Sequence, residues 1–128
     1  MNTNESKKVL LIEDEEVLAE MYQLALTKAR FQVELARNGA WGLKLANGKN
    51  FDIIILDMLM PAMQGHEAIE KLKTDKRTMD IPIMVLSNSA QDEDINKAKM
   101  LGVAAYMLKA HVTPSRVVSE IKKILEII

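Results

Sequence analysis

The sequence predicts an α/β domain in which helices cover both faces of a parallel sheet. Short apolar runs rich in β-branched residues recur along the chain, and segments with apolar residues at helical spacing follow them. Five such strand–helix units joined by short connections are typical of a parallel sheet covered on both faces. A length of 128 residues fits one domain of the commonest size.

Four of the five expected strands are continuous apolar runs, and the run at residues 53–56 is typical of a strand buried on both faces. These runs are residues 9–12, 53–56, 81–86 and 103–108. The remaining strand, residues 31–35, alternates apolar and polar side chains with period two. That alternation predicts an edge strand that is half-exposed to water.

Apolar residues three or four positions apart predict the helices, over residues 15–30, 40–46, 65–75 and 92–101 and from Pro114 onward. In the first of these, the apolar residues at helical spacing are Val17, Leu18, Met21, Leu24 and Ala25. The residues expected to face the core from the last three helices are Ala68, Ile69 and Leu72, then Ile95, Ala98 and Leu101, then Val117, Ile121, Ile124, Leu125 and Ile128. Pro114 suits a first helical turn, and Gly102 marks a helix end.

Composition and charge exclude several classes of function. A net charge of −1 gives no electrostatic case for direct binding to nucleic acid. The absence of cysteine excludes disulfides and thiolate chemistry and is compatible with a reducing cytoplasm. No apolar run reaches the roughly 18 residues of a membrane span. Residues 1–6 are expected to form a flexible, solvated tail ahead of one domain over residues 7–128.

Carboxylates stand at the ends of the first two apolar runs. Glu13 and Asp14 follow the first run, and Asp57 follows the second. Because open α/β sheets bind ligands outside the carboxyl ends of their strands, we expect these three carboxylates to lie together. Such carboxylates repel one another, and a divalent cation with oxygen ligands, best Mg²⁺, resolves the repulsion. Glu15 and Glu16 fit the simpler interpretation of acids that begin a helix.

The other two apolar runs end in a hydroxyl and an ammonium group. Ser87 follows the third run and Lys109 follows the fourth. Taken alone, Ser87 is typical of a helix cap, and Lys109 is typical of a solvated surface charge. Beside three carboxylates, however, they are the groups needed to bind a phosphoryl oxygen and to offset its charge.

Six residues together resemble the receiver domain of two-component response regulators: Glu13, Asp14, Asp57, Ser87, Tyr106 and Lys109. Met60, Pro61 and Gly65 also match that family's loop after the acceptor. The spacing is similar to that of single-domain receivers of the chemotaxis type. The resemblance implies a flavodoxin-like three-layer sandwich, with five helices and a five-stranded parallel sheet in the order 2-1-3-4-5.

The same resemblance implies a signalling switch and not a turnover enzyme. Asp57 is expected to accept a phosphoryl group from a phosphohistidine on a sensor histidine kinase or phosphotransfer protein. Mg²⁺ is expected to bind Asp14, Asp57 and the backbone carbonyl of Leu59, with Glu13 acting mainly through water. Lys109 is expected to pair with one phosphoryl oxygen.

Ser87 is expected to donate a hydrogen bond to another phosphoryl oxygen. Its inward movement would open space for Tyr106, whose ring could then move from exposed to buried; the simpler interpretation of Tyr106 is a half-exposed strand aromatic. A downstream protein is expected to bind the face formed by the fourth helix, fifth strand and fifth helix. The resemblance further implies a cytoplasmic protein, with no membrane contact, that is a monomer or a phosphorylation-linked dimer.

Ala110 departs from the family's pattern, because proline usually follows the lysine there, often after a cis bond. A non-proline cis peptide costs about 3–4 kcal/mol. The Lys109–Ala110 bond is therefore either trans with a shifted loop or a strained cis bond, and Lys109 is aimed less reliably. A second interpretation thus stays open, in which the receiver acts as an interaction module without phosphorylation.

Two other classes of protein fit the sequence less well. A phosphatase of the haloacid-dehalogenase type needs a second acid two positions after its nucleophile, where Leu59 stands. An FMN-binding flavodoxin needs a hydroxyl- and glycine-rich phosphate loop after the first strand. The acids from Glu13 to Glu16 stand in that place and would repel the phosphate.

Overall fold

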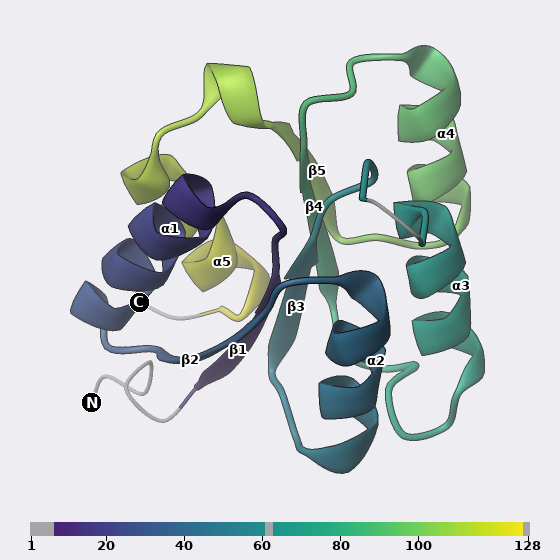
Figure 1. Cartoon of the computed structure of the whole chain (residues 1–128), viewed down its shortest axis with the longest axis horizontal. Coiled ribbons are helices and arrows are strands. Elements are labelled where there is room, and N and C mark those ends of the chain that lie inside the picture. The colour runs from purple at the N-terminus through teal and green to yellow at the C-terminus, as the bar shows by residue number, and fades with distance from the viewer. Residues whose placement is uncertain (1–6, 61–62, 127–128) are drawn as a thin grey trace.

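The computed structural model describes residues 7–60 and 63–126, and in them strands and helices alternate along the chain (Figure 1). The strands are β1 (Lys8–Ile12), β2 (Gln32–Ala36), β3 (Ile53–Leu56), β4 (Ile83–Ser87) and β5 (Ala105–Leu108). The helices are α1 (Glu16–Lys28), α2 (Gly39–Gly48), α3 (Gly65–Thr74), α4 (Asp92–Met100) and α5 (Pro114–Ile124). All strand pairs are parallel, and the order β2-β1-β3-β4-β5 confirms the predicted fold.

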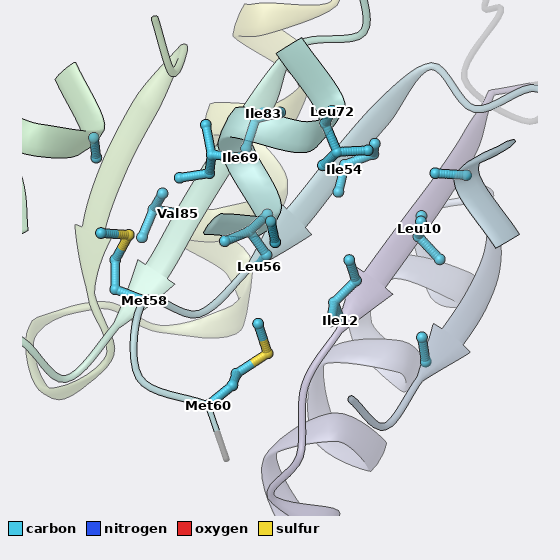
Figure 2. Packing of buried hydrophobic residues seen from close by; sticks show 14 of the residues in the cluster. Leu10, Ile12, Ile54, Leu56, Met58, Met60, Ile69, Leu72, Ile83 and Val85 are labelled. Atoms are coloured by element: carbon cyan, nitrogen blue, oxygen red, sulfur yellow. The ribbon is translucent and has the colours of Figure 1, made fainter. Parts of the chain in front are cut away.

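The sheet forms the middle of three layers. Helices α1 and α5 cover one face, and α2, α3 and α4 cover the other (Figure 1). Side chains of β3 alternate between the two faces: Ile54 and Leu56 pack toward α3, while Ile53 and Ile55 pack toward α1 and α5. The side chains on each face thus form a separate apolar core. Figure 2 shows the core on the α3 side of the sheet, to which α3 contributes Ile69. Burial on both faces explains why the central strands are continuous apolar runs.

Three strands begin later than the sequence predicts. In β5 the first residue is Ala105 and not residue 103, because the N–H of Val103 donates to the carbonyl of Ala98 in α4. In β4 the first residue is Ile83 and not residue 81, because Pro82 has no backbone N–H to give to a neighbouring strand. In β2 the strand begins one residue after Phe31, whose side chain is buried in the core beside α1. Its exposed and half-buried residues confirm the predicted edge strand.

Helix α1 forms as predicted, but the apolar residues whose spacing predicted it are not the ones that it buries. Its buried residues are Ala19, Tyr22 and Leu26. Val17, Met21 and Leu24 are instead 76%, 40% and 58% exposed. These three residues, one or two turns apart, form an exposed apolar row that we call the α1 stripe.

The later helices follow the predicted pattern more closely. Helix α3 buries Ala68, Ile69 and Leu72 as predicted. Helix α5 buries Val117 and Ile121, with Ile124 and Leu125 half-buried; in α4 only Ala98 of the predicted residues is fully buried. The predictions for residues 1–6, Pro61 and Ile128 lie outside the described residues. Within the described part of the chain, no helix combines the length and apolar character needed to cross a membrane.

Candidate metal and phosphoryl site

The carboxyl ends of β1 and β3 place three carboxylates together. Ile12 is paired with Leu56 in the sheet, so the residues that follow these two strands lie side by side. One carboxylate oxygen from each of Glu13, Asp14 and Asp57 lies within 4.8 Å of the other two. Glu13 and Asp57 are 2% and 4% exposed, so two of the three acids are buried. The structure therefore brings together the acids that the sequence placed at this edge.

Lys109 lies in the middle of this acidic group. Its Nζ atom is 2.7 Å from Asp57 Oδ2, 2.8 Å from Glu13 Oε1 and 3.4 Å from Glu15 Oε2. The lysine side chain is only 4% exposed. The peptide bond from Lys109 to Ala110 is trans, and Lys109 is the first residue of a 3₁₀ turn, Lys109–His111. The absence of proline thus leaves Lys109 aimed at Asp57.

Burial and ion pairing act on the pKa values of the lysine and its partner. Burial alone would lower the pKa of Lys109, but hydrogen bonds to Asp57 and then to Glu13 outweigh burial and raise the pKa well above its ordinary value. Burial raises the pKa of Glu13, although hydrogen bonds from Lys109 and from the backbone N–H of Glu15 oppose the rise. Lys109 is therefore a permanent cation at neutral pH, and it partly offsets the cost of burying the acids.

The loop after β3 holds Asp57 through its backbone. The N–H of Leu59 donates to Asp57 Oδ1 at 2.9 Å, and the N–H of Gly65 donates to the carbonyl of Met58 at 3.0 Å. A Cβ atom on Gly65 would lie 2.5 Å from the carbonyl oxygen of Asp57 and would also meet the Met58 backbone. Only glycine allows this close approach, which explains why the loop that carries Asp57 requires Gly65.

The donor set fits Mg²⁺. Three carboxylates supply the hard oxygen ligands that Mg²⁺ prefers, and Lys109 balances only one of their negative charges. Glu13, Asp14 and Asp57 are the residues that could hold the ion. The Leu59 carbonyl stays a predicted ligand, because the contact found for Leu59 is through its N–H.

Mg²⁺ is expected to stabilise the protein against heat, and Asp14→Ala is expected to remove most of that effect. Binding to the folded state alone stabilises by about 2.7 kcal/mol at a concentration 100 times Kd. Thermal unfolding with and without Mg²⁺ measures the effect. Asp80→Ala is a suitable control, because Asp80 is an exposed acid outside the group of three. A full Mg²⁺ shift in Asp14→Ala would place the ion elsewhere.

Ser87 lies on β4 and Tyr106 on β5, beside the group of three carboxylates. Ser87 is the last residue of β4 and is fully buried, and its Oγ accepts a hydrogen bond from the Ser89 N–H at 3.2 Å. Tyr106 is half-buried, and its hydroxyl donates to the Ser89 carbonyl at 2.9 Å. Burial raises the pKa of the Tyr106 hydroxyl. Among the described residues, no hydrogen bond joins Ser87 to Asp57.

Two charged residues at the site were not predicted to be there. Glu15 was interpreted only as a helix start, yet its carboxylate reaches Lys109. Arg37 donates from Nη2 to the backbone carbonyl of Asp14 at 3.0 Å. Arg37 directly follows β2, so its position at a strand end was a signal that could have identified it.

Known proteins that resemble this chain agree on one family. The response regulator receiver domain family matches residues 9–122. A probable transcriptional regulator, ycf29, of Porphyra purpurea is 33% identical over 120 residues, covering 94% of this chain and 57% of the relative. The transcriptional regulatory protein CusR of Escherichia coli K12 is 35% identical over 102 residues, covering 80% of this chain and 44% of the relative. The chain thus spans about half the length of these curated relatives.

Solved structures agree on the fold. The chemotaxis response regulator CheY4 of Vibrio cholerae superposes with a TM-score of 0.84 at 26% identity, covering 91% of this chain and 97% of that chain. A CheY-like receiver domain protein of Methanospirillum hungatei JF-1 has a TM-score of 0.88 at 24% identity, covering 94% of each chain. Family, relatives and fold lead to the same conclusion: the chain belongs to the response regulator receiver domains of two-component systems.

Proposed function

We propose that the chain is a phosphorylation-dependent switch whose Asp57 accepts a phosphoryl group from a phosphohistidine on a sensor histidine kinase or phosphotransfer protein. The supporting observation is the ion-paired group around Asp57. A buried lysine lies 2.7 Å from its carboxylate, and two further acids, whose oxygens could hold a metal ion, lie beside it. Such a group combines a nucleophile, a cation and a candidate metal site within one buried cluster.

In this proposal an Asp57 oxygen attacks the phosphorus atom. A P–O bond forms, the P–N bond to the imidazole breaks, and the electron pair returns to the ring nitrogen. Lys109 offsets negative charge on the phosphoryl oxygens, and the Leu59 N–H orients the carboxylate. Mg²⁺, when bound by Glu13, Asp14 and Asp57, would neutralise charge on the phosphoryl group. Positioning and electrostatics, both supplied by fixed groups, do most of the work.

The switch in this proposal involves Ser87 and Tyr106. Ser87 would donate to a phosphoryl oxygen, and the accompanying shift would change the Tyr106–Ser89 hydrogen bond. The Tyr106 ring is already half-buried. We therefore expect phosphorylation to change this hydrogen bond and not to move the ring from full exposure to burial. A downstream protein would then bind the altered face of α4, β5 and α5, with or without dimer formation. This is a local charge event acting on a two-state element.

A phosphodonor protein must contact the surface around Asp57, and the α1 stripe supplies apolar area on the helix that begins beside this site. The stripe begins at Val17, in the first turn of the helix whose N-cap residue, Glu15, reaches Lys109. A helix that exposes three large apolar residues fits a partner surface better than a solvated one. Docking on α1 would leave the face of α4, β5 and α5 free for the output.

The cytoplasmic location belongs to the same proposal and rests on the family alone.

Incubation with acetyl phosphate and Mg²⁺, followed by intact-mass measurement, tests the function. The proposal expects a mass gain of one phosphoryl group that is lost again after the donor is removed. A receiver that acts only as an interaction module would gain no mass under the same conditions. Omitting Mg²⁺ provides the control for the metal.

Leu59→Asn is expected to hydrolyse the acyl phosphate several-fold faster than the wild type. Leu59 is 53% exposed and apolar, so its side chain cannot orient a water molecule. Ser89 cannot orient the water molecule in its place, because its hydroxyl proton is donated to Asp94. Orienting the attacking water is much of what this step requires.

Timing phosphoryl loss after donor removal measures the effect, with Leu59→Ala as the matched control for lost bulk. Acceleration in Asn but not in Ala supports orientation of a water. Equal rates in the wild type and Leu59→Asn, or a slower Leu59→Asn, would contradict the role given to Leu59.

A further inference from the structure

Ser89 hydrogen-bonds to three different elements at once. It lies in the loop between β4 and α4 and is 6% exposed. Its N–H donates to Ser87 Oγ on β4, its hydroxyl donates to Asp94 Oδ2 on α4, and its carbonyl accepts from Tyr106 on β5. A change in the orientation of this one residue would therefore disturb all three contacts.

Asp94 holds the side chain of Ser89 in place. It lies in the first turn of α4, and its carboxylate is a charged acceptor, which makes stronger hydrogen bonds than a neutral one. The Ser89 Oγ also accepts weakly from the Gln91 N–H at 3.4 Å. With its hydroxyl fixed between these partners, Ser89 keeps its own N–H pointed at Ser87.

The contact from Ser89 determines how Ser87 can use its hydroxyl. A serine oxygen that accepts one hydrogen bond still has its own proton to donate. Because Ser87 is fully buried, and both the Ser89 N–H and the Tyr106 hydroxyl lie beside its oxygen, the proton is restricted to the remaining directions. A donor oriented before the reaction needs no reorganisation when charge develops on a phosphoryl oxygen.

We propose that Asp94 is a positioning residue for phosphoryl transfer, acting through Ser89 to hold the Ser87 hydroxyl ready to donate. This inference rests on the proposed role of Ser87 in the reaction. The competing explanation is that Asp94 only stabilises the start of α4, as acids do at helix N-termini. Asp92 provides a matched control, because it lies in the same first turn and is exposed.

The test measures the maximum rate and the half-saturating concentration of phosphoryl uptake from acetyl phosphate at saturating Mg²⁺. Asp94→Ala is expected to lower the maximum rate about fivefold, the worth of one hydrogen bond, with little change in half-saturation. Asp94→Asn is expected to recover most of the rate, because its amide oxygen can still accept from Ser89. Asp92→Ala is expected to react like the wild type, and an equal loss in Asp92→Ala would overturn the inference.

A double-mutant cycle with Ser87→Ala completes the test. If Asp94 acts through Ser87, adding Asp94→Ala to Ser87→Ala causes no further loss of rate. Two results would overturn the inference about Asp94 but not the proposed role of Ser87. One is a low rate in Ser87→Ala together with a normal rate in Asp94→Ala, and the other is an effect of Asp94→Ala that persists when Ser87 is already alanine. A normal rate in Ser87→Ala would overturn both the role of Ser87 and the inference, because Asp94 would then have nothing to position.

Discussion

Asp57→Asn is expected to abolish phosphoryl uptake from a small donor. An amide lacks the nucleophilic carboxylate oxygen, so no acyl phosphate can form. Asparagine has nearly the same shape, and its amide oxygen can still accept from either the Leu59 N–H or Lys109, which lie 2.9 Å and 2.7 Å from the present carboxylate oxygens. We therefore expect the variant to fold. Intact mass after incubation with acetyl phosphate and Mg²⁺ measures uptake, and circular dichroism checks the fold.

Asp52→Asn is the matched control for this prediction. Asp52 precedes β3 at the opposite end of the same strand, where it accepts a hydrogen bond from the Lys8 N–H at 2.8 Å. The same chemical change there leaves the acidic group intact, so uptake should match the wild type. A mass gain in Asp57→Asn at the wild-type rate would show that another residue is the acceptor.

The sheet and its strand ends could be predicted because burial on both faces leaves a direct record in the sequence. Each residue of β3 is apolar, since alternate side chains enter opposite cores. Once such runs are recognised, the residue that follows each one lies at the ligand-binding edge. This reasoning placed Glu13, Asp57 and Lys109 near one another without knowledge of their contacts.

The buried face of α1 could not be predicted in the same way. Helical spacing is satisfied both by Val17, Met21 and Leu24 and by the neighbouring apolar positions, so the pattern indicates a helix without saying which side faces the sheet. The structure buries Tyr22 and Leu26 and exposes the α1 stripe. Helix orientation depends on packing against α5 and the sheet, which periodicity alone does not contain.

Contacts between side chains were the least predictable part of the site. The effect of Ala110 could not be decided from sequence, because it depended on the backbone after Lys109, which proves to be a trans bond entering a 3₁₀ turn. The Ser89–Asp94 contact left no signal, since both residues are ordinary at the start of a helix. Such contacts are set by loop geometry, and the sequence pattern describes only the elements on either side.

Lys109→Met is expected to lower the free energy of unfolding by about 3 kcal/mol near neutral pH without Mg²⁺. Lys109 is 4% exposed and contacts two buried carboxylates, those of Asp57 and Glu13. Methionine retains much of the apolar stem but leaves these acids without their cation, and an unpaired buried charge is costly. The ammonium is also expected to be needed for phosphoryl uptake, so the same variant should react slowly.

The deficit should shrink as the pH falls, and Glu13 gives the reason. Its pKa in the folded protein is already raised above the ordinary 4.5 by burial, and the contacts with Lys109 that oppose the rise would be gone. A group with a raised folded pKa contributes its stability fully below the unfolded pKa and loses it as the pH rises through the folded value. The variant should therefore be closest to the wild type near pH 4.5 to 5 and furthest from it at pH 8.

Lys109 itself does not account for this trend. Because the folded pKa of Lys109 is raised above 10.5, its own contribution to stability is fully present below that pH and is lost only at more alkaline values.

Denaturant unfolding of the wild type and Lys109→Met at pH 5 and pH 8 measures the difference in their free energies of unfolding. Lys49→Met is the control: Lys49 also forms a 2.7 Å ion pair, with Glu34, but its side chain is 54% exposed, so the loss should stay below about 1 kcal/mol. A Lys109→Met deficit as small as that of Lys49→Met, or one that is the same at both pH values, would mean that the acids around Asp57 are solvated well enough not to need the lysine.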